Sequence, residues 1–545
     1  MATTIRLRRW QKEALELFGR RASPDFLAVA TPGAGKTTFA LTAARQHLAE
    51  HPRRRLVIVA PTQHLKVQWA DAAERLDLHL DPSWSAASGR PPADVHGLVI
   101  TYQGAAASAA ALAALGRDAF VVLDEIHHAG EERAWGDGVR VAFDEAAARL
   151  SLSGTPFRSD TRAIPFVRYD DDGLARPDVE YGYGDALRDG GVVRPVRFPR
   201  TDGEMEWIAA DGTAASATFQ DALDPVGSSQ RLRTALSVDG EWLPDVLTRA
   251  HARLLETRRG HPGAAGMVIA IDQDHARGIA ALMRRRVGAE PVLVVSEDPA
   301  ASARIATFAR GQEPWIVAVR MLSEGVDIPR LRVGVYATTT TTELFFRQAV
   351  GRLVRWTRGL GRQPSHMFIP DDPRLRAHAV AIAEQRRHSL RRRDDDGPAA
   401  DELDDPAADR EGPEPQLSLF AALSAVPLGG AGADAGPDEH HDEEIDPPEP
   451  EDDAALVLEL APAPLLGGAG EAADGERAVS PRERRRILRD ANANLVGEIA
   501  RITGLSHKQV NAELNRRVGI ARIDEATVEQ LERRRGQAVR WLEAA

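Results

Sequence analysis

The segment ATPGAGKTT at residues 30–38 combines small residues with one lysine and two neighbouring hydroxyl side chains. It follows the apolar run FLAVA, so we expect a strand, a tight loop and the start of a helix. Small residues let backbone N–H groups approach a triphosphate, while Lys36 can reach the β- and γ-phosphates and Thr37 can offer its hydroxyl to Mg²⁺. The predicted cofactors are therefore ATP and Mg²⁺. The residues expected to contact the nucleotide are Thr31, Gly33, Ala34, Gly35, Lys36, Thr37 and Thr38.

A second segment, VVLDEIHH at 121–128, places two carboxylates at the end of an apolar run. Open α/β sheets bind ligands at the carboxyl ends of their strands. We therefore expect Asp124 to hold Mg²⁺ and Glu125 to orient or deprotonate the attacking water. Zinc binding by His127 and His128 is the alternative. Adjacent histidines rarely converge on one ion without further spaced ligands, and a carboxylate-rich site with Thr37 suits Mg²⁺ better.

Further motifs follow in a fixed order, and over about residues 5–375 the chain resembles a superfamily 2 helicase of the DExH type, within the DEAD/DEAH-box group. It is closest in style to XPB-like and restriction-type motors. The motifs are LRRWQKEAL (7–15), APTQHLKVQW (60–69), TYQG (101–104), LSGTPFR (152–158), MLSEGVDIP (321–329) and FRQAVGRLVR (346–355). The resemblance implies two tandem RecA-like domains, each a doubly wound parallel sheet, and a nucleic-acid-dependent ATPase.

The resemblance also implies roles for individual residues. Gln11 would contact adenine, and Gly325 and Asp327 occupy the matching positions of a second-domain motif at the nucleotide site. The residues that would approach the γ-phosphate from the second domain are Gln348, Arg352 and Arg355. Those that would link the ATP state to strand binding are His127, Ser153 and Thr155. Those that would line the nucleic-acid path of the first domain are Thr62, Gln68, Thr101 and Tyr102.

The chain also departs from the family pattern. Ala30 replaces the first glycine of the P-loop, and Gln348 stands where many relatives have histidine; neither change removes a chemical group from catalysis. The absence of cysteine excludes the iron–sulfur domain of XPD-like helicases and the zinc module of RecQ-like helicases. We find no nuclease motif.

Two series of short apolar runs would position these residues. The first comprises residues 26–30, 56–60, 98–101, 120–124 and 150–153, and the second 267–271, 292–296, 315–319, 333–337 and 366–370. Such runs are typical of strands that are buried on both faces of a parallel sheet. We predict domain 1 at 1–195, a hinge with accessory elements at 196–245, and domain 2 at 246–393.

Charge divides the chain unevenly. Residues 394–480 contain 25 acidic and two basic residues, whereas the rest of the chain has 67 basic and 56 acidic residues. The acidic, proline- and glycine-rich tract is predicted to be disordered, and a basic body fits a protein that binds a polyanion. A solvated surface with an acidic spacer would explain the same charges. Without a membrane-length apolar span or a signal-peptide pattern, we expect a cytoplasmic monomer that does not contact membranes.

Within the acidic tract, QLSLF at 416–420 groups apolar side chains where folding has no use for them. It resembles the sliding-clamp-binding motif of bacteria, which implies a partner contact through Gln416, Leu417, Leu419 and Phe420. A chance match is the competing explanation. Beyond it, residues 481–545 regain helical patterning, with a turn predicted at Gly504 and a helix capped by Ser506. This pattern resembles a helix-turn-helix, and two packed helices without nucleic-acid contact would explain it equally well.

The leading interpretation is a DNA helicase or translocase that acts on single strands or duplex junctions in DNA repair or replication, with RNA not excluded. Two alternatives stay open. One is an ATPase that remodels RNA or protein–nucleic acid complexes without processive unwinding. The other is an interaction scaffold that uses ATP as a conformational switch.

Overall fold

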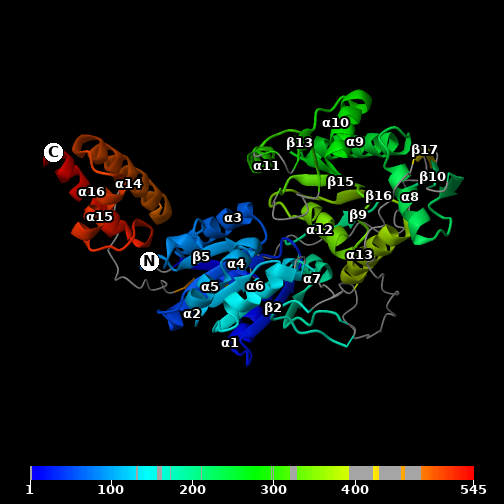
Figure 1. Ribbon diagram of the computed structural model, residues 1–545. Helices are drawn as coiled ribbons and strands as arrows, with labels where there is room; N and C mark the ends of the chain where they lie inside the picture. The colour runs from blue at the N-terminus through cyan, green and yellow to red at the C-terminus, as the bar shows by residue number, and fades with distance from the viewer. Residues whose placement is uncertain are drawn as a thin grey trace.

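The structure is a computed structural model with two α/β units and a separate three-helix unit at the carboxyl end (Figure 1). It describes residues 3–130, 133–155, 163–171, 173–209, 212–295, 298, 300–319, 328–391, 421–428, 456–460 and 480–544. Within these ranges, we find no helix with the length and apolar composition that crossing a membrane requires.

The first sheet is parallel throughout. Its spatial order is β4 (Leu80–Asp81), β5 (Gly97–Thr101), β3 (Leu56–Ala60), β6 (Phe120–Leu123), β7 (Ala148–Ser153), β2 (Asp25–Ala30) and β8 (Val179–Tyr181). The five runs predicted as strands in this half are confirmed. Alternate side chains of these strands enter two separate hydrophobic clusters, as expected of a sheet that is covered on both faces.

Helices cover the two faces of this sheet. One cluster contains residues of α1 (Arg9–Gly19), α2 (Lys36–Glu50) and α3 (Gln63–Glu74). The opposite cluster contains residues of α4 (Tyr102–Ala107), α5 (Ala109–Gly116) and α6 (Arg133–Phe143). The helix α7 (Tyr183–Asp189) then leads toward the second sheet. The carboxyl ends of the strands therefore hold the P-loop and the Asp124–Glu125 pair at one edge.

The second sheet also has a parallel centre. It consists of β16 (Ser365–Pro370), β15 (Leu331–Ala337), β12 (Ala265–Ala270), β14 (Trp315–Val319) and β13 (Val292–Val294), in that spatial order. All five predicted runs of this half are confirmed as strands. The helices are α8 (Pro225–Ala235), α9 (Trp242–Gly260), α10 (Gln273–Val287), α11 (Ala301–Arg310), α12 (Glu343–Leu353) and α13 (Pro373–Arg391). One hydrophobic cluster continues from the first sheet into this one.

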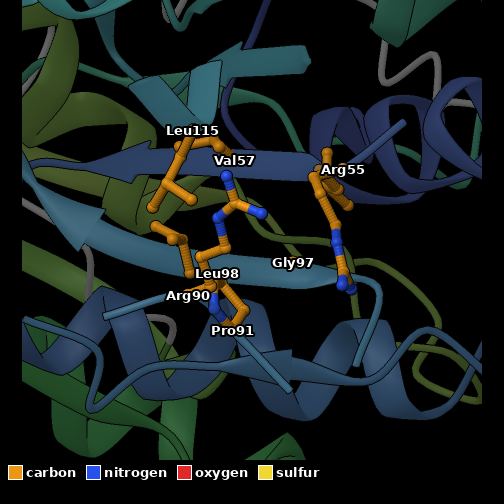
Figure 2. Close-up of a pocket in the computed structure, with 8 residues that line it drawn as sticks. Arg55, Val57, Arg90, Pro91, Gly97, Leu98 and Leu115 are labelled. Atoms are coloured by element: carbon orange, nitrogen blue, oxygen red, sulfur yellow. The ribbon is translucent and has the colours of Figure 1, made fainter. Parts of the chain in front are cut away.

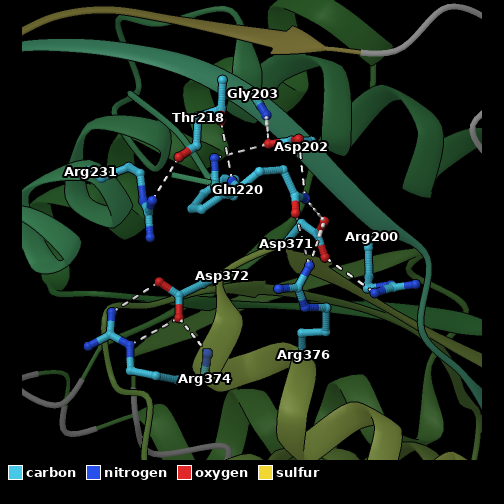
Figure 3. A network of polar contacts seen from close by, with 11 residues as sticks. Arg200, Asp202, Gly203, Thr218, Gln220, Arg231, Asp371, Asp372, Arg374 and Arg376 are labelled. Atoms are coloured by element: carbon cyan, nitrogen blue, oxygen red, sulfur yellow. Dashed lines mark hydrogen bonds and ion pairs between the residues drawn. The ribbon is translucent and has the colours of Figure 1, made fainter. Parts of the chain in front are cut away.

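Residues 196–245, for which we predicted a hinge with accessory elements, supply elements that extend the second sheet. They supply β9 (Val196–Arg197), β10 (Arg200–Ile208) and β11 (Ala214–Thr218), together with α8. A polar network at the end of β16 fixes them there (Figure 3). The amide Nε2 of Gln220 lies 2.8 Å from Asp371 Oδ2 and 3.4 Å from Asp202 Oδ2, so one side chain joins β10 and β16.

The acidic tract contributes two strands, which corrects the expectation that all of it lacks fixed structure. β17 (Ala421–Leu428) pairs antiparallel with β10, where Ala425 is buried and accepts a hydrogen bond from the backbone of Glu241. β18 (Leu456–Leu460) pairs antiparallel with β1 (Thr3–Leu7). The average composition of the acidic tract did not indicate these two strands, because each is short and apolar and pairs with a strand far away in the sequence.

The three-helix unit follows the predicted plan. α14 (Pro481–Thr503) ends at Gly504, whose φ of +69° is left-handed, and Ser506 caps α15 (His507–Val518) by accepting from the backbone of Gln509. A third helix, α16 (Val528–Ala544), completes the unit. Its hydrophobic centre surrounds Arg534, which is fully buried and bonded to three asparagine side chains.

The three-helix unit contacts the first domain through charged groups near β4 and β5. Arg485 lies 2.6 Å from Asp94 Oδ1, and the backbone N–H of Val528 donates to Asp94 Oδ2 over 2.9 Å. Arg482 forms a further ion pair with Asp71 of α3 at 2.8 Å. This unit therefore lies on the first domain, on the side away from the second sheet (Figure 1).

Candidate nucleotide site

The P-loop leaves β2 and enters α2 through two glycines that need left-handed backbone. Gly33 has φ of +90° and Gly35 has φ of +91°, conformations that glycine adopts without a steric penalty. The neighbours are also close. A Cβ atom at Gly33 would lie 3.2 Å from Arg355 Nη1, and one at Gly35 would lie 2.6 Å from Gln11 Nε2. Both positions therefore favour glycine for two reasons: the backbone is left-handed, and neighbouring atoms leave little room for a side chain.

Three side chains at the start of the chain hold this loop by its carbonyl groups. Arg8 Nη1, Trp10 Nε1 and Gln11 Nε2 donate to the carbonyl oxygens of the successive residues 33–35, over 2.7, 3.1 and 2.9 Å. With its carbonyls occupied on one side, the loop can present its N–H groups on the other, as phosphate binding requires. Arg8 and Trp10 were not predicted, because only contact with the loop reveals their role.

Both the oxygen and the nitrogen of the Gln11 side-chain amide form hydrogen bonds within the protein. Its Oε1 accepts from the backbone N–H of Arg8 over 2.8 Å while its Nε2 donates to Gly35, and its side chain is buried. The contact with adenine implied by the family resemblance stays a prediction. In this structure, Gln11 shapes the P-loop.

Glu125 lies at the centre of a compact polar cluster. Its Oε1 is 2.9 Å from Lys36 Nζ, and its Oε2 accepts from the backbone N–H of Gly154 over 2.9 Å. Burial would raise the pKa of Glu125, but the charges of Lys36 and His127 and the two hydrogen bonds outweigh it and lower the pKa to about 2. Glu125 is thus an ionised carboxylate that can accept a proton from, or orient, a water molecule.

Asp124 lies beside Glu125 and is almost completely buried. Its Oδ2 accepts from Trp69 Nε1 over 2.8 Å, and its backbone carbonyl accepts from the hydroxyl of Tyr102 over 2.9 Å. Burial and the neighbouring charge of Glu125 raise the pKa of Asp124 to about 6. A buried carboxylate, Asp124, and a partly exposed one, Glu125, thus lie side by side, and Glu125 pairs with Lys36.

These donors fit a magnesium ion. The site offers hard oxygen ligands, and its two adjacent carboxylates exceed the single positive charge of Lys36, so the cluster carries a net negative charge that favours binding a cation. Asp124 and the hydroxyl of Thr37, in the first turn of α2, would hold Mg²⁺. When bound with ATP, the ion would neutralise charge on the phosphates.

His127 joins the first domain to the second. Its Nδ1 lies 3.4 Å from Ser153 Oγ and 3.7 Å from Glu125 Oε2, while its Nε2 lies 3.1 Å from Gln348 Nε2. Ser153 Oγ also donates to the carbonyl of Thr155 over 2.8 Å. The residues predicted for coupling are therefore in one chain of contacts that runs from Glu125 to Gln348.

The second domain also approaches the P-loop directly. Arg352 lies in the last turn of α12, and Arg355 follows it with its guanidinium beside Gly33. A Cβ atom at Gly351 would lie 2.5 Å from Pro32 Cγ, so α12 and the loop nearly touch. The chain crosses between the domains at the same place, where Val193 forms a β-bridge with Arg355.

The residues predicted for nucleic-acid binding divide into two groups. Thr62 caps α3 by accepting from the backbone of Leu65, and Gln68 contacts His64; both are partly exposed, so a strand can reach them. Thr101 caps α4 and is 5 % exposed, and Tyr102 is completely buried. The expectation that Tyr102 contacts a strand is wrong in this structure, because its hydroxyl faces Asp124.

Two sets of predicted residues lie outside the described part of the chain. These are Gly325 and Asp327 of the second-domain motif, and the partner motif at Gln416, Leu417, Leu419 and Phe420. Their roles stay predictions.

A cavity of about 190 Å³ lies in the first domain but belongs to a different region (Figure 2). Arg55 and Arg90 reach it from the amino ends of the strands, beside Leu98 and Leu115. It is thus at the sheet edge opposite the P-loop, and it is not part of the nucleotide site.

Comparison with known proteins places the chain among bacterial relatives. The Type III restriction enzyme, res subunit family matches residues 4–158. The chain is similar to "Uncharacterized protein MT2985" of Mycobacterium tuberculosis (strain CDC 1551 / Oshkosh), with 41% identity over 562 residues that cover 97% of this chain and 91% of the relative. It is also similar to "Uncharacterized protein ML1624" of Mycobacterium leprae (strain TN), with 45% identity over 390 residues that cover 70% of this chain and 65% of the relative.

Among solved structures, the chain is similar to a fragment of a HsdR subunit of a type I restriction enzyme from Vibrio vulnificus YJ016. The TM-score is 0.48 at 17% identity, over 68% of this chain and 65% of that chain. The match to the restriction-enzyme family and the relatives that span nearly the whole chain agree with the ordered motifs. The chain therefore belongs to the family of these mycobacterial proteins, within superfamily 2 of the helicases and with similarity to the restriction-type members.

Proposed function

We propose that this protein is an ATP-driven DNA helicase or translocase that serves DNA repair or replication. One observation carries the proposal: residues of the second domain lie against both His127 and the P-loop of the first domain. Gln348 lies 3.1 Å from His127, and the guanidinium of Arg355 lies against Gly33 of the P-loop. A site assembled from two domains makes hydrolysis depend on how those domains sit together.

The chemistry explains why such a site would be split. Phosphoryl transfer develops negative charge on the transferred group, and an arginine finger contributes about 10³ to 10⁵ in rate. Arg352 and Arg355 would supply that charge when the domains close, while Glu125 orients water and Lys36 holds the phosphates. A strand that binds across both domains would bias closure, and ATP turnover would then drive steps along it.

Charge and helix placement support a nucleic acid as the track. Outside residues 394–480 the chain has a surplus of basic residues, and the partly exposed Thr62 and Gln68 lie on or next to α3. Contacts of this kind address phosphates, so they position a strand without reading its sequence. We assign DNA as the substrate; a translocase that acts on RNA would share this geometry, and the assay must include both.

Two assays test the proposal. In the first, the protein moves along a 3′- or 5′-biotinylated single strand and displaces streptavidin; in the second, it separates a labelled duplex with a single-stranded tail. We expect ATP-dependent displacement on DNA in at least the first assay. Activity on RNA alone would indicate a remodelling ATPase. ATP turnover without movement in either assay would indicate a scaffold that uses ATP as a switch.

We further propose a bacterial sliding clamp as a partner, bound through residues 416–420. The support is the motif itself and its position immediately before β17, which starts at Ala421 and is paired with β10. A peptide attached directly to the second sheet would hold the motor beside the ring that encircles DNA, which raises the local concentration of the two proteins.

A further inference from the structure

The two segments expected to line the nucleic-acid path each send one buried aromatic side chain to Asp124. Trp69 of α3 donates from Nε1 to Asp124 Oδ2 over 2.8 Å, and Tyr102 of α4 donates from its hydroxyl to the Asp124 carbonyl over 2.9 Å. Trp69 is 2 % exposed and Tyr102 is 0 % exposed. Neither side chain can therefore bind a strand, and both are bonded to the residue predicted to hold Mg²⁺: Trp69 to the carboxylate of Asp124 and Tyr102 to its backbone carbonyl.

The acceptor used by Trp69 is unusual within its own domain. A buried indole N–H needs a hydrogen-bond acceptor, and a backbone carbonyl is sufficient. Trp10 donates to the carbonyl of Ala34, and Trp84 donates to the carbonyl of Gly89 over 2.9 Å. Trp69 donates to a side-chain carboxylate instead. Burial alone therefore explains why the indole has a partner, but not why that partner is the metal ligand.

The helix that carries Trp69 has two different faces. Trp69, Ala70 and Ala73 are buried against the sheet, whereas Gln63 and Val67 are exposed. Thr62 caps the amino end of the same helix. A strand bound at the exposed side of α3 would therefore lie on the opposite face of this helix from the indole that bonds to Asp124.

We propose that Trp69 is a positioning residue that orients Asp124 for Mg²⁺ and transmits strand binding at α3 to the metal site. Its N–H holds one carboxylate oxygen and leaves the other for the metal. Tyr102 supports the same residue from α4 by fixing its backbone. A displacement of either helix by a bound strand then displaces Asp124. The part that concerns strand binding rests on the proposed function, whereas the part that concerns the metal does not.

The first test measures metal binding without hydrolysis. Mn²⁺ replaces Mg²⁺, and its binding to the full-length protein with ADP is followed by electron paramagnetic resonance. Trp69→Phe keeps an aromatic ring but removes the donor. Because loss of an outer-shell hydrogen bond typically weakens metal binding about 10- to 100-fold, we expect at least about 10-fold weaker Mn²⁺ binding. Trp84→Phe, which loses a bond to a carbonyl in the same domain, should bind Mn²⁺ like the wild type. Equal affinity in all three proteins would overturn the proposal.

The second test measures coupling. Trp69→Phe and Tyr102→Phe should bind single-stranded DNA with unchanged affinity, yet lose most of the stimulation of ATP turnover that DNA gives the wild type. Normal stimulation in both variants would overturn the coupling.

If nucleic acid does not stimulate the wild type, the proposed function fails, and the Mn²⁺ result still decides the metal part. If circular dichroism shows that Trp69→Phe is unfolded, Tyr102→Phe decides: weaker Mn²⁺ binding supports the proposal, and unchanged binding contradicts it.

Discussion

Glu125 shows how single residues make this site. Its φ of +47° lies in the left-handed region, which non-glycine residues adopt only when their surroundings hold them there. Lys36 and the backbone of Gly154 supply that restraint by binding its two carboxylate oxygens. A Cβ atom at Gly154 would lie 3.1 Å from Lys36 Nζ, so a larger residue there would require the lysine to shift. The local strain is thus located at the group that is to activate water.

Lys36→Ala should abolish ATP turnover and leave the fold intact. The lysine is the positive charge expected to reach the β- and γ-phosphates, and it starts a helix whose core contacts lie elsewhere. Turnover is measured by phosphate release and folding by circular dichroism. Lys12→Ala, which removes an exposed lysine of α1, is the control and should keep full activity. Persistent turnover in Lys36→Ala would remove the catalytic assignment.

Arg355→Ala should lower kcat far more than it raises the dissociation constant of ATP. The guanidinium is expected to meet charge that develops only in the transition state, so we predict a loss of about 10³-fold or more in kcat. Stopped-flow binding of a fluorescent ATP analogue and steady-state turnover separate the two effects. Arg347→Ala removes an arginine of α12 that pairs with Glu343, and it should change neither. Weak ATP binding with a normal kcat would contradict the finger role.

At the scale of elements, the strands and the turn that depend on local residue patterns could be predicted from the sequence. Apolar runs identified ten strands, and Gly504 with Ser506 identified the turn between α14 and α15. The pairing of β10 with β17 was not predictable, because it joins residues about 220 positions apart and neither strand is a continuous apolar run. In the site, the residue types and positions of two segments predicted Lys36 and Glu125, and the family resemblance predicted His127. The roles of Arg8, Trp10 and Trp69 depend on packing, which no spacing rule encodes.

The buried histidine of β16 predicts a pH dependence of stability. Burial, reinforced by the nearby charges of Arg253, Arg197 and Arg332, lowers the pKa of His366 to about 3. An unfolded histidine titrates near 6.5, so between these values the unfolded chain binds more protons and stability falls as pH falls. From pH 7.5 to 5.5 this group should cost about 1.4 kcal/mol. Thermal unfolding should therefore lose more in Tm over this range for the wild type than for His366→Phe. Equal losses would contradict the assignment.

At the scale of the whole molecule, the first domain is the part to which all others attach. The second domain meets it at the nucleotide site, the three-helix unit pairs with Asp71 and Asp94, and β18 of the acidic tract pairs with β1 just before Arg8. Three of these contacts, at His127, at Asp71 of α3 and at β1, lie on or beside elements to which we assign ATP or strand binding, whereas Asp94 lies at the opposite edge of the sheet. This arrangement allows other parts of the chain to affect the motor.

Clamp binding is a prediction at this scale. Replacing Gln416, Leu419 and Phe420 together by alanine should abolish binding to a bacterial sliding clamp, because the motif is expected to place an amide and two apolar side chains in the clamp's pocket. DNA-stimulated ATP turnover in solution should not change. Fluorescence anisotropy of a labelled peptide covering 412–424 at low salt gives the affinity. Undetectable binding of this peptide would refute the partner assignment.

Whether nucleic acid drives this ATPase is tested most directly by ATP turnover of the full-length protein at saturating MgATP, with and without nucleic acid. Single-stranded DNA, duplex DNA and RNA of equal length are compared. The Lys36→Ala variant, which should have no turnover, gives the background rate. We predict slow turnover without nucleic acid and an increase of roughly ten-fold or more with DNA, since strand binding should favour the closed arrangement in which Arg355 acts. Turnover that is equal with and without every nucleic acid would contradict it.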